Sequence, residues 1–202
     1  MSRTHPDDPA HTLVIDTSIF VNPDTQALLG PSVDAAVEGF LEIAREQHLH
    51  IYIPTSIFRE MRHFVSPSTL DKLRTYATVR APDLFSLHIP AAVLHFFIRD
   101  VRQRIDRGLR VAEQAARAES SDETLRHLRK KYREVVRAGI VDSVEDLDVV
   151  LLAKEINGTI LTADEGIRNM AQVLGIQVLS VREFLLKFAH IPLNLKSTPD
   201  AE

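Results

Sequence analysis

Cysteine is absent from the 202-residue chain, and its absence removes several kinds of chemistry at once. Without cysteine the chain can form no disulfide, no thiolate nucleophile and no cysteine-ligated zinc site, which suits a reducing interior, so we expect a cytoplasmic protein. Long apolar runs are also absent: none approaches the roughly 18 residues that a membrane-spanning helix needs, and residues 1–11 lack the hydrophobic region of a signal peptide. We therefore expect no membrane partner.

Sequence signatures of three common enzyme classes are missing too. There is no HExxH zinc pattern, no glycine-rich phosphate loop and no G-x-S-x-G nucleophile turn, which disfavours zinc hydrolysis, a nucleotide cofactor and serine hydrolysis. His48 and His50 stand close together, but a structural role is favoured over a metal pair. Hydrophobic residues make up 45% of the chain, which is enough for the core of one domain.

Short apolar runs alternate with helical patterns along most of the chain. Buried strands are predicted at residues 12–15, 50–53, 159–161 and 176–179, and a proline-bearing connection at residues 79–90. Helices are predicted over residues 31–47, after Pro54, from a capping box at Ser68, over the acidic stretch from Asp142, up to Leu174, and from Ser180. This order predicts an α/β fold in which helices cover both faces of a parallel sheet.

Residues 91–139 differ from the rest because they contain no proline and no strand pattern. Apolar residues recur there at intervals of four and three, with an interruption near Gly108, which predicts a long helix packed against another helix. The turn between them is predicted at residues 119–123. We therefore expect an inserted basic helical hairpin (91–139), a discontinuous α/β domain (12–90 and 140–190) and flexible termini (1–11 and 191–202).

Four aspartates are predicted to gather at one edge of the sheet. Asp16 and Asp164 follow buried strands, whose carboxyl ends form the usual ligand-binding edge, and Asp142 and Asp146 open a predicted helix. Oxygen ligands suit Mg²⁺ or Mn²⁺, and paired cations can activate water and stabilise the leaving oxygen of a phosphodiester. Helix capping or the helix dipole explains each aspartate singly, but the four together favour a metal site.

Three segments resemble the motifs of PIN-domain metal-dependent nucleases: LVIDTSIF (13–20), IPTSIFREM (53–61) and EDLDVVLLAKEINGTILTADEGI (145–167). More narrowly, IVDSVEDLDVVLLAKE (140–155) and the helical insert before it are similar to the small protein-only ribonuclease P proteins of bacteria and archaea, also called RNA ligase partner proteins. This resemblance implies an endoribonuclease that removes the 5′ leader of precursor tRNA, leaves 5′-phosphate and 3′-hydroxyl ends, and needs no RNA subunit.

The same resemblance implies a set of site residues and partners. Its catalytic metal ligands would be Asp16, Asp142, Asp146 and Asp164, with Mg²⁺ or Mn²⁺ as the cofactor. It further implies that the hairpin builds a homo-oligomer, so that the helices of one subunit measure RNA cleaved by another.

Five polar residues near the aspartates are candidates for orienting metal ligands or waters: Glu60, Glu145, Asp148, Thr17 and Thr162. Glu60 stands where many PIN domains carry a second acidic residue, although a helix-surface charge explains it equally well. Asp148 lies about 200° around a helix from Asp146, so we expect it on another face. Thr17 and Thr162 are also explained as helix starters.

Charge is divided unevenly along the chain. Residues 88–139 hold twelve Arg or Lys against seven Asp or Glu, a net charge near +5, which leaves the remainder near −9. Five of these cations recur at helical spacing and predict a basic stripe: Arg126, Arg129, Lys130, Arg133 and Arg137. A solvated face explains an isolated stripe as well, but beside a phosphodiesterase site we expect it to bind RNA phosphates.

Two other functions remain open from the sequence. Another PIN endoribonuclease, such as a toxin-like enzyme that cuts mature tRNA or ribosomal RNA, would share the metal site. A non-catalytic RNA-binding or ligase-partner protein would need only the basic stripe. The position of the cut and its dependence on metal distinguish the three functions.

Overall fold

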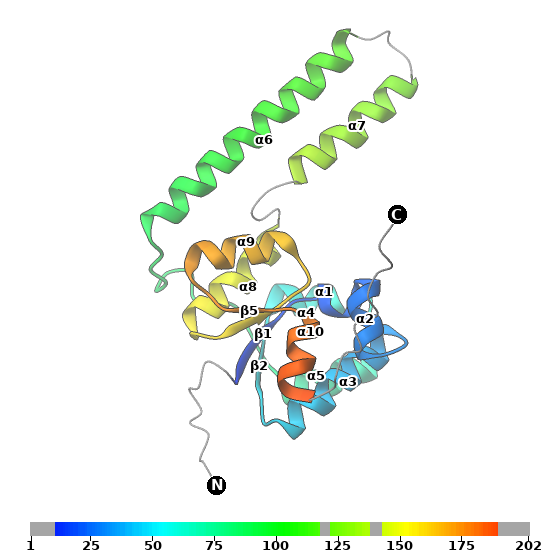
Figure 1. The fold of residues 1–202 in the computed structure, drawn as a ribbon, viewed down its shortest axis with the longest axis vertical. Helices are drawn as coiled ribbons and strands as arrows, with labels where there is room; N and C mark the ends of the chain where they lie inside the picture. The colour runs from blue at the N-terminus through cyan, green and yellow to red at the C-terminus, as the bar shows by residue number, and fades with distance from the viewer. Residues whose placement is uncertain (1–10, 118–121, 138–142, 190–202) are drawn as a thin grey trace, which may run out of the picture.

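The protein consists of a body built on one sheet and an arm of two helices that projects from the body (Figure 1). The structure, a computed structural model, describes residues 11–117, 122–137 and 143–189. Within these ranges five parallel strands lie in the order β3-β2-β1-β4-β5. They are β1 (Thr12–Ile15), β2 (His50–Pro54), β3 (Thr78–Arg80), β4 (Thr159–Leu161) and β5 (Val178–Leu179). The predicted α/β class is confirmed.

The central strands are β1 and β4, and all of their residues are buried. Helices cover both faces of the sheet, so these strands carry continuous apolar runs instead of alternating apolar and polar residues. Val14 of β1 lies opposite Tyr52 of β2 on one side and Ile160 of β4 on the other. Because every pairing is parallel, the carboxyl ends of all these strands meet at one edge.

The helices of the body are α1 (Ser18–Val21), α2 (Pro23–Leu29), α3 (Val33–Glu46), α4 (Thr55–Met61), α5 (Pro67–Tyr76), α8 (Val144–Glu155), α9 (Glu165–Leu174), α10 (Val181–Phe184) and the π-helical turn η1 (Leu185–Ala189). Helix α8 packs across β1, β2 and β4, with α4 and α9 beside it. Phe40 of α3 contacts the rings of Phe20 and Phe184 at centroid distances of 5.7 and 5.3 Å, which ties α1, α3 and α10 together.

The predicted boundaries are correct where local chemistry is specific. Helix α8 ends as expected before Asn157, which adopts a left-handed φ of 51°, and β4 starts at Thr159. Ser180 and Glu183 form the predicted capping box at the start of α10. Such side-chain caps satisfy backbone groups that a helix end leaves open.

Other local predictions differ from the structure: the helix predicted from Asp142 begins at Val144, with Ser143 as its N-cap, and the strand predicted over residues 176–179 covers only Val178–Leu179. Residues 79–90 were predicted as connection only, but Thr78–Arg80 form β3, a short edge strand that pairs with β2 alone and lacks an apolar run. Helix α5 begins at Pro67 after Ser66, so Ser68 does not cap it. Helix α2 was not predicted; Asn22 caps it by accepting a hydrogen bond from the Asp24 N–H at 3.0 Å.

The arm consists of α6 (Ala91–Arg117) and α7 (Asp122–Arg137), which run side by side over the upper part of α6 (Figure 1). Gly108 is buried at their contact, where an added Cβ would lie 2.9 Å from the ring of Tyr132. The interruption of the apolar spacing at Gly108 therefore marks a close approach of the helices. The expected flexible ends, except His11, and most of the expected turn lie outside the described residues.

The apolar seam of α6 packs only partly against α7. Helix α6 packs against α7 as predicted, but Leu94, Ile98 and Ile105 are 59, 51 and 63% exposed, so the described residues do not bury this part of the seam. Near the base of the arm, Val93 is buried in the core of the body. None of the helices described is long and apolar enough to cross a membrane.

Candidate active site

A cavity of about 650 Å³ opens at the carboxyl edge of the sheet. Such an edge is where parallel α/β sheets bind ligands, because the loops that follow the strands leave a crevice there. Five carboxylates contribute to its wall: Asp16, Glu60, Glu145, Asp146 and Asp164. The other lining residues are Thr17, Ser18, Val21, Ser56, Arg59, His63 and Ser143.

Asp16 is the most buried of these carboxylates, with 4% of its surface exposed. Its Oδ2 accepts hydrogen bonds from the hydroxyl of Ser18, from Thr162 Oγ1 at 2.9 Å and from the Ser18 N–H at 3.3 Å. Burial raises the pKa of Asp16 above its ordinary value, these hydrogen bonds oppose that rise, and the charge of Asp164 adds to it. A cation between Asp16 and Asp164 would relieve both the burial and the repulsion.

Thr162, fully buried, connects the two aspartates. Its hydroxyl donates to Asp16 and accepts from the Asp164 N–H at 2.9 Å. Ser18 acts in a parallel way, since its hydroxyl donates to Asp16 and accepts from the Ala163 N–H at 2.9 Å. Both hydroxyl protons are therefore directed at one oxygen of Asp16, and no described residue donates to its Oδ1.

Asp164 both caps a helix and lines the cavity. Its Oδ1 accepts the Ile167 N–H at 2.9 Å, so it is the N-cap of α9, as its ordinary explanation required. It also lines the cavity. Capping fixes the side chain at the edge of the sheet, which leaves the carboxylate available to a ligand.

Helix α8 brings Asp146 and Glu145 to the cavity in its first turn. Ser143 caps the helix by accepting the Asp146 N–H at 3.0 Å. Asp142, the remaining predicted metal ligand, lies outside the described residues. The structure therefore brings together Asp16, Asp146 and Asp164 of the predicted set.

The other predicted polar residues take different positions. Glu60 lines the cavity and its Oε2 accepts from Thr17 Oγ1 at 3.2 Å. Asp148 is not among the lining residues; its Oδ2 accepts from Ser56 Oγ at 2.6 Å and so joins α8 to α4. This is the different face of α8 that its helical position predicted.

Sequence reasoning missed Arg59 and His63 in the cavity wall. Ser56, Arg59 and His63 follow one another at intervals of three and four residues, which places them on one side of the helical segment that also carries Glu60. That spacing in IPTSIFREM and the residues after it was a usable signal. These two side chains put basic groups beside the carboxylates.

The donor set fits a hard divalent cation in its chemistry. All candidate donors at the sheet edge are carboxylate or hydroxyl oxygens, which suit Mg²⁺ or Mn²⁺ better than soft metals. Among the described residues no three His, Asp or Glu side chains form a group that could hold a metal alone. A cation beside Asp16 and Asp164 would thus need waters, or a ligand from outside the described residues, to complete its shell.

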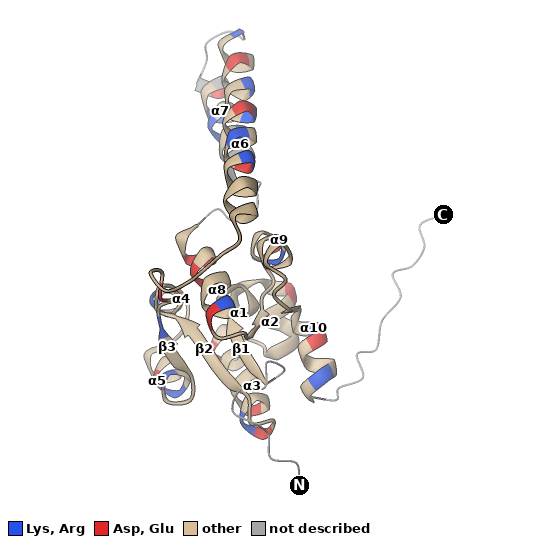
Figure 2. Ribbon diagram, turned by 90° about the vertical axis from the view of Figure 1, so that its left-hand side faces the viewer, with Lys and Arg blue, Asp and Glu red and all other residues tan. Residues whose placement is uncertain are grey.

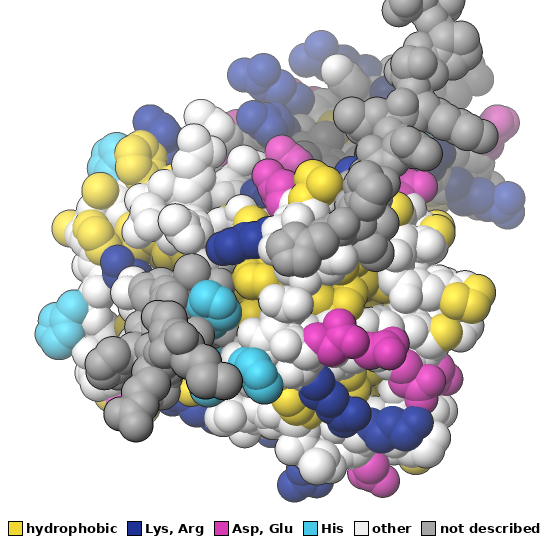
Figure 3. Space-filling model, turned by 60° about the horizontal axis from the view of Figure 1, so that its bottom comes forward, with side chains coloured by type: hydrophobic (Ala, Val, Ile, Leu, Met, Phe, Trp, Pro, Cys, Tyr) yellow, Lys and Arg dark blue, Asp and Glu magenta, His cyan; other side chains and the backbone are white. Residues whose placement is uncertain are grey.

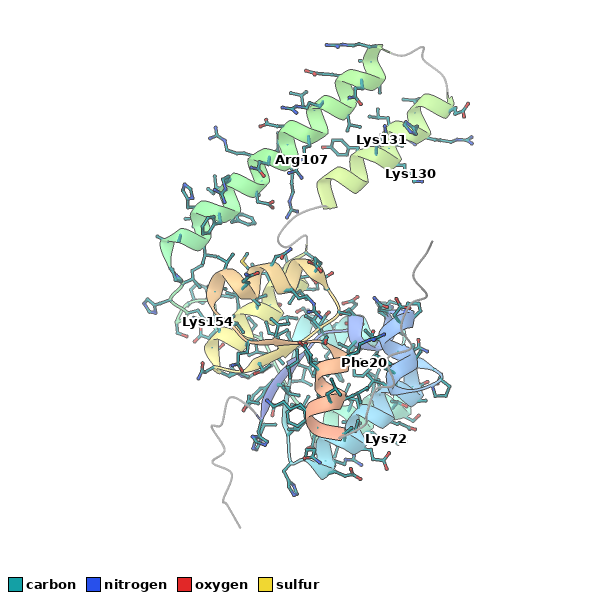
Figure 4. The ribbon with its side chains drawn as sticks, viewed as in Figure 1. Phe20, Lys72, Arg107, Lys130, Lys131 and Lys154 are labelled. Atoms are coloured by element: carbon teal, nitrogen blue, oxygen red, sulfur yellow. The ribbon has the colours of Figure 1, made fainter. Side chains whose placement is uncertain are left out.

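The arm carries both basic and acidic residues (Figure 2), and over residues 88–139 twelve Arg or Lys stand against seven Asp or Glu. Arg126, Arg129 and Lys130 are exposed on α7, whereas the side chains of Arg133 and Arg137 lie outside the described residues. Figure 4 places Lys130 on α7 and Arg107 on α6, away from the body. On the face of the body shown in Figure 3, acidic and basic side chains lie next to one another.

Comparison with known proteins gives a consistent result. Residues 12–190 match the PINc domain ribonuclease family. Three similar curated proteins bear the name RNA-free ribonuclease P. That of Thermodesulfovibrio yellowstonii is 38% identical over 85% of this chain and 90% of its own length, and that of Pyrococcus abyssi is 39% identical over 85% and 88%. The protein of Halorhodospira halophila is 42% identical over 84% of this chain and 85% of its own length.

Proposed function

Because the chain belongs to the PINc domain ribonucleases, and within them to the RNA-free ribonuclease P proteins, we propose that it removes the 5′ leader of precursor tRNA without an RNA subunit. The observation that carries this proposal is the buried Asp16, held by Ser18 and Thr162 and facing Asp164 at the carboxyl edge of the sheet. A tRNA-processing role would place the protein in the cytoplasm.

The proposed catalytic group is Asp16, Asp142, Asp146 and Asp164, which would hold Mg²⁺ or Mn²⁺. Such a metal would supply activation of the attacking water and stabilisation of the leaving 3′ oxygen, and the products would carry 5′-phosphate and 3′-hydroxyl ends. Ser18 and Thr162 favour the ionised form of Asp16 by donating to its Oδ2. Glu60, held by Thr17, is placed to orient water in the cavity.

The arm supplies the proposed RNA-binding surface. Contacts between basic side chains and phosphates are independent of sequence and suit recognition of a folded RNA by its shape. Arg126, Arg129 and Lys130 are exposed on α7, where the phosphates of an RNA can reach them. We assign them, with Arg133 and Arg137, to the mature part of the tRNA.

The lower half of α6 supplies the proposed contact between subunits. Its exposed apolar side chains are Leu94, Phe97 and Ile98, and Ile105 and Leu109 continue the exposed set past the middle of the helix. Exposed apolar clusters of this kind mark protein–protein contacts, since leaving them in water is unfavourable. The chain would assemble as a homo-oligomer through its arm.

The first test is cleavage of 5′-labelled precursor tRNA by the purified protein with Mg²⁺, with Mn²⁺ or with EDTA. We expect one cut, at the mature 5′ end, and only with metal. Asp16→Asn should lower the rate by at least about a hundredfold, whereas Asp24→Asn, on the exposed start of α2, should not change it. Cleavage inside mature tRNA would indicate a toxin-like nuclease, and metal-independent or absent cleavage would contradict the proposal.

A further inference from the structure

A second cavity adjoins the active site along α4. It measures about 360 Å³ and is lined by Thr55, Phe58, Arg59, Arg62, Arg74, Ala77 and Val79. Arg59 lines both this cavity and the active-site cavity. A third cavity of about 300 Å³ shares Phe58, Arg62 and Arg74 with the second. Neighbouring cavities share lining residues, and we call the surface that carries Arg59, Arg62 and Arg74 the arginine groove.

The arginine groove has an unusual charge for this part of the molecule. Residues outside 88–139 sum to about −9, yet the second cavity is lined by three arginines and no carboxylate. One acidic residue, Asp71, lines the third cavity. The groove is therefore positive next to an acidic site.

These arginines are also available to a ligand. All three are exposed, and none of their guanidinium groups forms a hydrogen bond or ion pair with a described residue. Two other basic residues of the body are engaged: Lys72 pairs with Glu38 and Arg80 with Glu155. Guanidinium groups left open along a groove match the charge of a phosphodiester backbone and can donate two hydrogen bonds to one phosphate.

The direction of the groove identifies which part of the RNA it would meet. The groove runs from α4, beside the active site, to α5, which lies on the side of the body away from the arm (Figures 1 and 2). If the arm holds the mature tRNA, the strand that continues past the scissile phosphate leaves on the other side. That strand is the 5′ leader.

We propose that Arg59, Arg62 and Arg74 bind the phosphates of the single-stranded 5′ leader. This proposal rests on the proposed function and deepens it by assigning the leader a binding site of its own. Because the contacts are to phosphates, the groove accepts leaders of any sequence. Arg59 lies nearest the cut, since it lines the active site too.

The experiment compares precursor tRNAs with a leader of one nucleotide and with a leader of about eight nucleotides, enough to run along the groove. The wild type should cleave the longer substrate with a higher kcat/KM. In Arg62→Ala/Arg74→Ala the ratio of the two kcat/KM values should fall to about one. Arg62→Lys/Arg74→Lys should keep most of the preference, because the positive charge remains.

Binding in EDTA, where no cleavage occurs, gives a second readout. For the longer substrate, the slope of log affinity against log salt should be lower in the double alanine variant by roughly 1.4, the value for two single-strand phosphates. The matched control is Lys72→Ala/Lys154→Ala, which removes two charges from α5 and α8 outside the groove (Figure 4). This control should retain the wild-type ratio and slope.

Three results would overturn the groove as a leader site. They are a wild type indifferent to leader length, a double variant that keeps the wild-type ratio and salt slope, and a double variant that weakens both substrates equally. Equal weakening would assign the groove to the mature tRNA. Failure of the proposed function gives a different result. In that case the wild type does not cut at the mature 5′ end, whereas the effect of leader length on binding can still be measured in EDTA.

Discussion

At the scale of single residues, the site depends on hydroxyl groups as much as on carboxylates. The Thr162 hydroxyl donates a hydrogen bond to Asp16 and accepts one from the Asp164 N–H, so it positions both aspartates. Ser18 repeats this arrangement with Asp16 and the Ala163 N–H. The geometry of the carboxylates is therefore fixed by two small side chains that never need to touch the substrate.

Replacing Thr162 by Val tests this arrangement. Valine fills the same space, but it removes a donor from Asp16 and leaves the Asp164 N–H without its acceptor. We expect the free energy of unfolding to fall by about 1–3 kcal/mol, the cost of a buried polar group that loses its partner. Urea unfolding measures it. Thr162→Ser keeps the hydroxyl, so its free energy of unfolding should fall clearly less. An equal fall in the two variants would contradict the role of the hydroxyl.

The sequence predicted some site positions and missed others for physical reasons. Asp16 and Asp164 could be placed because each follows a short buried strand, and parallel strands bring their ends to one edge. Arg59, on the short helix α4, and His63, in the turn after it, were missed because exposed basic residues resemble ordinary surface charges. Their role depends on which side of α4 faces the sheet edge, and packing against α8 decides that side.

At the scale of elements, the cap of α10 was predictable, but the capping box at Ser68 and the weak edge strand β3 were not predicted correctly. Ser180 and Glu183 have a local pattern that requires only a few residues of chain. Strand β3 has three residues and one neighbour, so its existence depends on β2 already being in place. Its signal lies in tertiary pairing and not in its own composition.

The cap of α10 makes stability depend on pH. Hydrogen bonds from the Ser180 N–H and hydroxyl lower the pKa of Glu183 below its ordinary value of 4.5. A carboxylate with a lowered pKa in the folded state stabilises that state above pH 4.5 and loses the effect as pH falls through the folded pKa. Glu183→Gln should therefore reduce the free energy of unfolding at neutral pH by roughly 0.5 kcal/mol, as expected for a charge at a helix start.

Denaturant unfolding at several pH values checks this prediction. The difference between wild type and Glu183→Gln should shrink as pH falls below 4.5. A difference that stays constant from neutral to acidic pH would show that the charge of Glu183 is not responsible.

At the scale of the whole molecule, the net charge does not show that the arm is basic and the body is acidic. The overall charge of −4 combines a basic arm with an acidic body. Leu94, Phe97 and Ile98 are exposed near the start of α6, at the base of the arm, whereas α7 with its basic residues runs beside the upper part of α6 (Figure 1). The same two helices thus have room for a subunit contact and an RNA contact.

Charges placed in the apolar part of α6 should disrupt assembly. If the wild type forms the proposed homo-oligomer, Leu94→Glu/Ile98→Glu should shift it toward the 22.7 kDa monomer, because burying these carboxylates in a contact is unfavourable. Light scattering after size-exclusion chromatography gives the mass. Leu186→Glu, at a site 53% exposed on η1, is the matched control and should leave the mass unchanged. A monomeric wild type would contradict the proposed contact.

The pairing of β1 with β4 also has a consequence for the order in which the protein is made. Asp16 follows β1, near the start of the chain, whereas Thr162 and Asp164 follow β4, near its end. A ribosome releases these segments at the beginning and toward the close of synthesis, respectively. A nascent chain therefore has no assembled site until nearly all of it has emerged, so RNA near the translating ribosome is safe from an unfinished enzyme.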